Sequence, residues 1–212
     1  MYEKFVPRYP GRYLTSNVKI TINGVSRPMG SLYRKFTTSI NHYTILAFGI
    51  LFDFRENDKL VSTCQPVDEL IKESWFQHVL MTETYDVDLI VVVGHTPIRN
   101  STGFEYDLVL SEIRRRLPTM PVQFFGGHSH IRDFRKYDDY AYGIESGRYL
   151  ETLGWIGVDL EPFHVGRRYI DNNVAGYRFH TGIEEEQQFE TKEGQAISHE
   201  IELKVPTSEK SG

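Results

Sequence analysis

Two short apolar runs, each closed by glycine and then histidine, constrain the fold of this chain more than any other feature. Residues 89–93 are all apolar, and residues 122–125 hold three apolar side chains and one glutamine. Runs this short without polar alternation predict strands that are covered on both faces of a sheet. A helical pattern over residues 104–117, stopped by Pro118, lies between them. This order predicts a βαβ unit with parallel strands and a right-handed crossover.

The rest of the chain adds mainly β structure to this unit. A helix is expected over residues 66–81, opened by proline, and a hairpin excursion is expected around Arg27. Trp75 and Trp155 lie in apolar stripes and are expected in the core. Further strands are expected over residues 18–23, 43–52, 140–146, 149–155 and 156–160. The fold class is therefore α/β, with an all-β stretch in the later part of the chain.

Composition excludes several classes of protein. The chain has 212 residues, 40% of them hydrophobic and 25% charged, which is ordinary for a globular domain. A net charge of −5 argues against a nucleic-acid-binding protein, because such proteins neutralise phosphates with an excess of positive charge. The longest apolar run, residues 45–52, is too short for a membrane span, which needs about 20 residues. A single cysteine, Cys64, excludes a disulfide within the chain and a cysteine-based metal cluster.

Three histidines follow the two strands of the βαβ unit. His95 comes directly after the first strand's glycine, and His128 and His130 come after the paired glycines of the second. Parallel strands joined by a crossover end at the same edge of a sheet, where open α/β sheets place their ligands. A single glycine–histidine pair is usually only a turn. Two such pairs at matching strand ends favour a metal site, because neutral imidazoles bind zinc, iron, manganese or nickel.

These residues resemble a known family. Residues 91–97 and 124–130 are similar to the last two signature blocks of the calcineurin-like metallophosphoesterases, within them the 5′-nucleotidase branch and its fungal vacuolar phosphoesterases. Residues 13–18 resemble the branch's serine–asparagine strand, and residues 144–149 its strand after the histidine pair. The similarity covers about residues 1–205. It implies part of an α-β-β-α sandwich that hydrolyses phosphoesters.

The resemblance also assigns the three histidines to metals. His95 and His128 would bind one divalent ion and His130 the other, and the complete site would hold two ions of zinc, manganese or iron. In such sites the metals lower the pKa of a bound water, so that hydroxide attacks phosphorus.

Three residues near the histidines are candidates for supporting roles. Asp133 is a candidate carboxylate for orienting a ligand histidine through a hydrogen bond, with a solvated turn as the alternative. Arg132 and Arg148 are candidates for contacting an anionic substrate, and for Arg148 a salt bridge at the sheet edge is the alternative.

The family's earlier signature blocks are absent from this sequence. An Asp-x-His, a Gly-Asp and a Gly-Asn-His-Glu block should precede the matched region, and they carry the bridging aspartate and the catalytic histidine. No catalytic residue is therefore assigned in this chain. We expect a C-terminal piece of a longer protein, with weak or absent hydrolysis alone. Residues 1–183 would form the later part of the phosphoesterase domain, and residues 184–212 a linker or the start of a truncated domain.

Two classes of function follow from these expectations. The first is a metal-dependent phosphoester hydrolase that acts on a small phosphate ester, with nucleotides as candidates. The second is a non-catalytic remnant that binds a metal, or a partner through an exposed sheet edge. The resemblance implies a vacuolar location, whereas a cytoplasmic one follows if this chain is the natural product. Metal identity, substrate and oligomeric state stay open at this stage.

Overall fold

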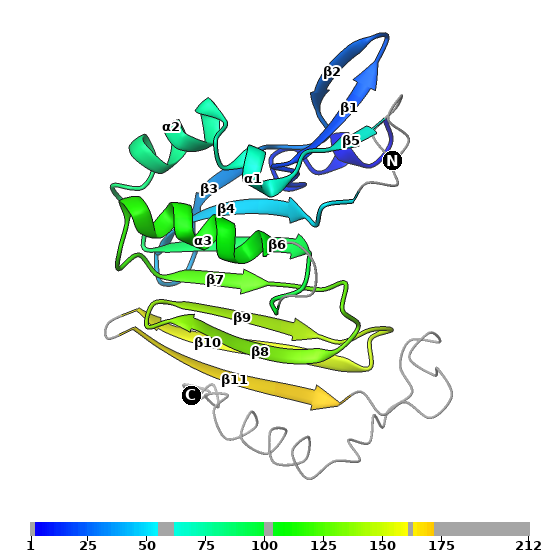
Figure 1. Ribbon diagram of the computed structural model, residues 1–212. Helices are drawn as coiled ribbons and strands as arrows, with labels where there is room; N and C mark the ends of the chain where they lie inside the picture. Colours follow the sequence, from blue (N-terminus) through cyan, green and yellow to red (C-terminus); the bar gives the residue numbers. More distant parts are fainter. Residues whose placement is uncertain (1–2, 55–61, 100–103, 161–162, 172–212) are drawn as a thin grey trace, which may run out of the picture.

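The computed structural model describes residues 3–54, 62–99, 104–160 and 163–171, and the expected tail of residues 184–212 lies outside them. Figure 1 shows a mixed α/β molecule with more sheet than helix, as predicted. Its elements are a 3-10 turn (Val6–Arg8), β1 (Val18–Ile22), β2 (Val25–Pro28), β3 (Tyr33–Thr37), β4 (Thr44–Leu51), β5 (Ser62–Cys64), α1 (Val67–Leu70), α2 (Ser74–Thr82), β6 (Leu89–His95), α3 (Glu105–Arg116), β7 (Val122–Phe125), β8 (Arg132–Asp138), β9 (Ala141–Ser146), β10 (Thr152–Leu160) and β11 (Phe163–Asp171).

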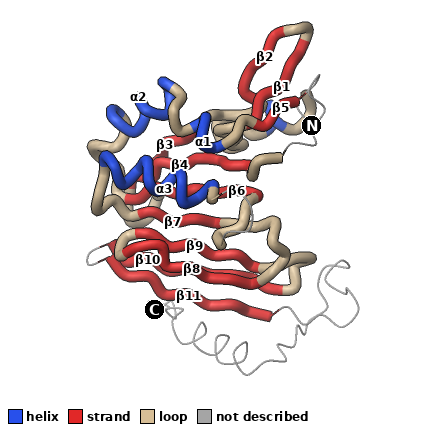
Figure 2. The backbone as a smooth tube through the Cα atoms, viewed as in Figure 1, coloured by secondary structure: helices blue, strands red, loops and turns tan. Residues whose placement is uncertain are grey.

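A six-stranded sheet in the order β3-β4-β6-β7-β9-β8 forms the centre of the molecule (Figure 2). The four inner strands run parallel, and the two edge strands, β3 and β8, pair antiparallel with their neighbours. The predicted βαβ unit is confirmed as β6-α3-β7. Because β6 and β7 are parallel neighbours, the segments that follow them leave the sheet at the same edge.

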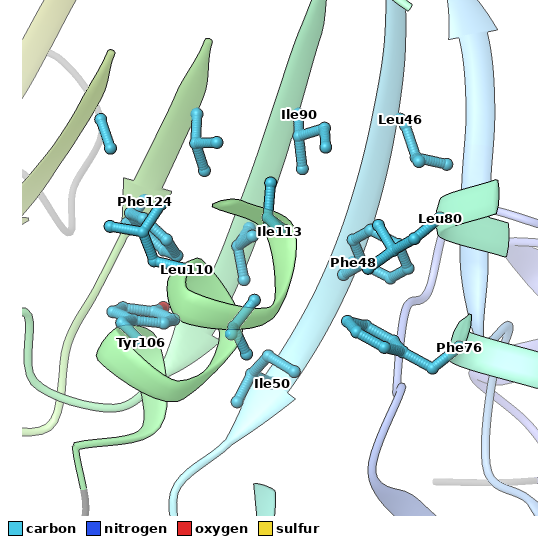
Figure 3. Close-up of a cluster of buried hydrophobic side chains, with 14 of the residues drawn as sticks. Leu46, Phe48, Ile50, Phe76, Leu80, Ile90, Tyr106, Leu110, Ile113 and Phe124 are labelled. Atoms are coloured by element: carbon cyan, nitrogen blue, oxygen red, sulfur yellow. The ribbon is translucent and has the colours of Figure 1, made fainter. Parts of the chain in front are cut away.

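The helices cover one face of this sheet and enclose the core. Phe48, Val92 and Phe124 are register partners on β4, β6 and β7, and all three are fully buried. The tilted ring of Tyr106 from α3 packs against Phe124 at 4.7 Å between ring centroids, and the ring of Phe76 from α2 lies 5.1 Å from that of Phe48 (Figure 3). Each such side chain contributes about 1.5–3 kcal/mol of transfer free energy. This packing makes the strands a rigid base for the loops at their ends.

The other face of the sheet is only partly covered, which corrects one expectation. The β10–β11 hairpin packs over β8 and β9, where Gly154 N donates to Ser146 Oγ at 3.1 Å. Beyond the hairpin, Val93 is 40% exposed and its register partner Phe125 is 38% exposed. On β6 only the helix face is fully buried, whereas on β7 the opposite face holds the buried Gln123, 2% exposed, beside the exposed Phe125. Both faces of β6 are apolar in sequence, so composition could not distinguish them.

Two secondary-structure expectations are also corrected. The helix expected over residues 66–81 is divided into α1 and α2, because the chain makes tight turn hydrogen bonds between them, such as Lys72 N to Glu69 O. The two strands expected over residues 149–155 and 156–160 are the single strand β10. Gly157 does not end this strand, since it pairs in register with Gly166 of β11.

One predicted core residue lies on the surface instead. Trp155 is 55% exposed, and its ring lies along β10 over Gly157, where an added Cβ would come within 2.8 Å of the indole. Trp75 is partly buried and packs against the core, as expected, and its ring stacks on that of Tyr33 with centroids 6.5 Å apart. Gly157 thus makes room for an exposed tryptophan on the outer side of the hairpin.

A small sheet in the order β2-β1-β5 joins the first residues to β4 through buried polar side chains. Asn17 is fully buried, accepts from Leu51 N at 2.9 Å and donates to Leu51 O at 2.7 Å. Ser16 Oγ accepts from Gly49 N at 3.0 Å. These bonds hold the segment before β1 against the end of β4, beside the loops that carry the histidines.

Candidate metal site

His95 and His128 meet at the ends of neighbouring strands. His95 is the last residue of β6, and His128 follows β7. His95 Nε2 lies 3.1 Å from His128 Nδ1, and the two rings stand edge to face with centroids 4.9 Å apart. His128 and His130 both adopt positive φ angles, 77° and 62°, which few residues other than glycine adopt without support. Such backbone strain is typical of functional sites.

An aromatic side chain closes one side of the histidine pair. Phe52, in the loop after β4, lies 4.1 Å from the His128 ring and 5.8 Å from the His95 ring, measured between centroids. Burial lowers the pKa of His95 below its ordinary value, and positive charge on His128 and on His130 would lower it further. A lowered pKa keeps His95 neutral near pH 7, and the neutral imidazole is the form that binds a metal.

The separation of the two nitrogens fits shared ligation of one ion. Two imidazole nitrogens at about 2.0–2.1 Å from a tetrahedral ion lie about 3.3 Å apart. The observed distance from His95 Nε2 to His128 Nδ1, 3.1 Å, is close to this value, and it is also the distance of a hydrogen bond between the rings when one of the two nitrogens carries a proton. In the part of the chain that the structure describes, no group of three or more His, Cys, Asp or Glu side chains is placed to hold a metal. The described residues therefore supply a pair of converging donors.

His130 does not join this pair directly. Its ring lies 6.3 Å from the ring of Tyr149, a 71% exposed side chain whose φ is 54°. The Arg148 guanidinium lies 5.1 Å above the same tyrosine ring. His130, Tyr149 and Arg148 thus form a second group of side chains, and the assignment of His130 to a second ion stays a prediction.

The other candidate residues have partners of their own. Asp133 accepts hydrogen bonds from Arg99 Nε at 2.7 Å and from Phe134 N at 2.7 Å. Arg132 lies 5.3 Å above the ring of Tyr169. The roles expected for Asp133 and Arg132 stay predictions.

A buried carboxylate that sequence reasoning did not single out connects the two histidine loops. Glu145 on β9 is 2% exposed, accepts from Ile98 N at 2.5 Å and accepts from Ser129 Oγ. Burial raises the pKa of Glu145, and the hydrogen bonds from Ser129 and Ile98 partly offset that rise. The sequence feature that could have indicated this role is the position of Glu145 as the single charged residue in residues 141–146.

A second buried carboxylate lies on the other side of His95. Glu105, in the first turn of α3, is 5% exposed. It accepts from Thr96 Oγ1 at 3.1 Å and from Asp53 N at 3.2 Å, which ties the loop after β6 to the loop after β4. An acidic residue in a first helical turn is common for the helix dipole alone, so its sequence position did not reveal this role.

With this geometry described, known proteins can be compared. No protein-family model matches the chain. The crystal structure of 5′-nucleotidase from Candida albicans superposes with a TM-score of 0.74 and 38% sequence identity, covering 95% of this chain and 38% of that one. A protein named "Secreted protein" from Arthroderma benhamiae is 34% identical, covering 94% of this chain and 36% of its own length. An uncharacterized protein of Schizosaccharomyces pombe is 35% identical, over 94% of this chain and 37% of its own.

These comparisons confirm the resemblance to the 5′-nucleotidase branch of the metallophosphoesterases. The similarity in sequence and fold extends over nearly the whole chain, well beyond the histidine blocks. The chain spans 36% to 38% of the length of these relatives.

Proposed function

We propose that this chain supplies the histidine half of a metal-dependent phosphoester hydrolase site. His95 and His128 would hold one divalent ion, and His130 would bind the second. The 3.1 Å approach of His95 Nε2 to His128 Nδ1 at the ends of adjacent parallel strands carries this proposal. The resemblance to a 5′-nucleotidase supports the same chemistry.

The chain's own residues prepare the site in three ways. Bound ions of this kind lower the pKa of a water and neutralise charge on the phosphate during attack. Partial burial lowers the pKa of His95, which favours the unprotonated form that can coordinate. Phe52 lies against one side of the otherwise exposed His128 ring and restricts the orientation of that ring. Arg148, next to Tyr149 and His130, supplies a positive charge for a phosphate ester at the site's outer side.

We propose a nucleotide as the substrate class, on the basis of the Candida albicans 5′-nucleotidase. Residues 1–183 would act as part of the phosphoesterase domain. Hydrolysis by this chain alone should be weak, because three imidazoles offer no bridging carboxylate to hold two ions about 3.5–4 Å apart.

Metal binding and hydrolysis can be measured on the same protein preparation. The wild-type chain is expected to bind zinc or manganese, and His95→Ala and His128→Ala are each expected to abolish tight binding. His78→Ala, which changes a histidine on α2, serves as the control. Hydrolysis of p-nitrophenyl phosphate and of nucleoside monophosphates by the chain alone should stay near background. Turnover typical of enzymes, or metal binding that both site variants retain, would overturn the proposal.

A partner-binding role is the second candidate. Val93 and Phe125 leave an apolar area on the far face of the sheet, and a pocket of about 330 Å³ that borders Val93 and His95 adjoins it. If this role holds, the chain should bind a partner without needing metal. Metal titration with a readout of complex formation separates the two candidates.

We propose a vacuolar location, in line with the resemblance to fungal vacuolar phosphoesterases. The name of the Arthroderma benhamiae relative, "Secreted protein", supports a route through the secretory system. Among the described residues, no helix is both long and apolar enough to cross a membrane. A fluorescent fusion of the full gene product should overlap a vacuolar marker, and fluorescence spread through the cytoplasm would contradict this location.

A further inference from the structure

Glu145 lies between the two loops that carry the histidines and contacts both of them. One carboxylate oxygen accepts from Ile98 N at 2.5 Å, three residues after His95. The other accepts from Ser129 Oγ, between His128 and His130. Each loop therefore uses a different oxygen of the same side chain.

Burial makes this arrangement costly unless both hydrogen bonds form. Glu145 is 2% exposed, and an ionised carboxylate removed from water is strongly destabilising without hydrogen-bond partners. An apolar side chain of similar size would fill the same space without this cost. A carboxylate at this position is therefore explained by its two hydrogen bonds, one from a backbone N–H and one from a hydroxyl of the two loops.

The loops are also packed too closely for much independent movement. A Cβ added at Gly126 would lie 2.6 Å from Ile98 Cγ2 and 3.0 Å from Glu145 Cγ, so glycine is required where the two loops meet. Gly127 N donates to Thr96 O at 3.0 Å, which adds a second connection. His128 lies between these two connections on its loop, and His95 directly precedes Thr96 on the other.

We propose that Glu145 is a positioning residue, which sets the separation and orientation of His95 and His128 through Ile98 and Ser129. The positive φ angles of His128 and His130 leave the segment between them strained, and the hydrogen bond from Ser129 to Glu145 holds it in that conformation. The metal part of this inference rests on the proposed function, whereas the loop-holding part can be measured without metal.

The alternative is that Glu145 acts through its charge, as a ligand or as an electrostatic partner of the ion. Glu145→Gln separates these roles, because glutamine keeps an acceptor for Ile98 N and gains a donor toward Ser129 Oγ. A positioning residue should be rescued by glutamine, and a charged ligand should not. Glu145→Ala removes both connections.

The first measurement uses the metal-free protein. Amide hydrogen exchange at Ile98 should be at least 10-fold faster in Glu145→Ala than in wild type and close to wild type in Glu145→Gln. Nuclear Overhauser contacts between the His95 and His128 rings should be present in wild type and Glu145→Gln and lost in Glu145→Ala. Glu112→Ala, which removes a carboxylate from α3 away from the histidine loops, is the matched control and should change neither readout.

The second measurement is zinc affinity by competition with a chelating dye. Loss of a residue that orients a ligand typically weakens metal binding about 10- to 100-fold, which is expected for Glu145→Ala. Glu145→Gln should stay within about threefold of wild type. Ser129→Ala, which removes one connection without creating a core cavity, should give an intermediate loss and serves if Glu145→Ala does not fold.

The outcomes distinguish this inference from the proposed function. If wild type binds no zinc, the proposed function is wrong. The amide hydrogen exchange rate at Ile98 still tests whether Glu145 holds the two loops together. If Glu145→Gln loses affinity as strongly as Glu145→Ala, the side chain acts by charge and the positioning role is wrong. Wild-type behaviour of both Glu145→Ala and Ser129→Ala would also overturn it.

Discussion

The two faces of the central sheet are built from the same strands but are covered very differently. On the helix face, Val92 and Phe124 are fully buried between β6, β7 and the helices. On the opposite face their sequence neighbours, Val93 and Phe125, are 40% and 38% exposed. The difference shows that the apolar content of a strand does not reveal which face is packed. Adjacent residues in one strand should therefore respond very differently to the same substitution.

The largest contrast is expected between Phe124→Ala and Phe125→Ala. Phe124 is enclosed by the rings of Tyr106 and Tyr137, with centroids at 4.7 Å and 4.9 Å, so its removal leaves a cavity. We expect Phe124→Ala to lower the free energy of unfolding by about 3–5 kcal/mol. Phe125→Ala should cost less than about 1.5 kcal/mol, since part of its surface already contacts solvent. Urea denaturation measures both, and equal losses would contradict the difference between the faces.

A smaller contrast compares two consecutive valines. Val92→Thr places a hydroxyl in the core beside α3, at a position with no exposure, and should lower the free energy of unfolding by about 1–3 kcal/mol. Val93→Thr makes the same chemical change on the open face, where water can solvate the hydroxyl, and should stay within about 0.5 kcal/mol. Thermal unfolding of the pair provides the comparison. A large loss for Val93→Thr would mean that this face is covered in solution.

The smallest expected effect concerns the ion pair that joins α3 to the edge strand β8. Arg114 of α3 donates to Asp138 at 2.7 Å and 3.1 Å and to Met120 O at 2.7 Å. Arg114→Ala should lower the free energy of unfolding by about 1–2 kcal/mol. Arg115→Ala, whose side chain is 58% exposed, is the control and should destabilise the protein clearly less than Arg114→Ala.

The same ion pair predicts a pH dependence. Burial alone would raise the pKa of Asp138, but hydrogen bonds from Arg114 and from Tyr140 N hold it below its ordinary value. A folded pKa below the unfolded value of about 3.9 adds stability above that pH, and the stability is lost as the pH falls through the folded pKa. Wild type should therefore lose more stability than Arg114→Ala between neutral pH and pH 3. Parallel pH profiles for the two proteins would show that the pair contributes nothing.

The sequence was most informative where local pattern and topology agree. The βαβ unit followed from two apolar runs and one helical pattern, and the meeting of His95 with His128 followed from the rule that parallel strands end at one edge. The resemblance added the assignment of metals. None of these inferences needed knowledge of long-range packing.

The features that the sequence did not reveal depend on contacts between distant segments. The exposure of Phe125 depends on how far the β10–β11 hairpin reaches across the sheet, which no local pattern encodes. Trp155 looked like a core residue, yet it lies on the outer side of the hairpin over Gly157. The role of Glu145 depends on its hydrogen bonds with Ile98 and Ser129, which lie in the loops after β6 and β7.

The central claim is that His95 and His128 together bind one metal ion. X-ray absorption spectroscopy of the zinc-loaded chain tests it directly. We expect imidazole nitrogen ligands at about 2.0–2.1 Å, with the imidazole scattering signature lost when both histidines are replaced by alanine. A zinc shell of oxygen ligands alone, or a spectrum that the double variant leaves unchanged, would contradict the claim.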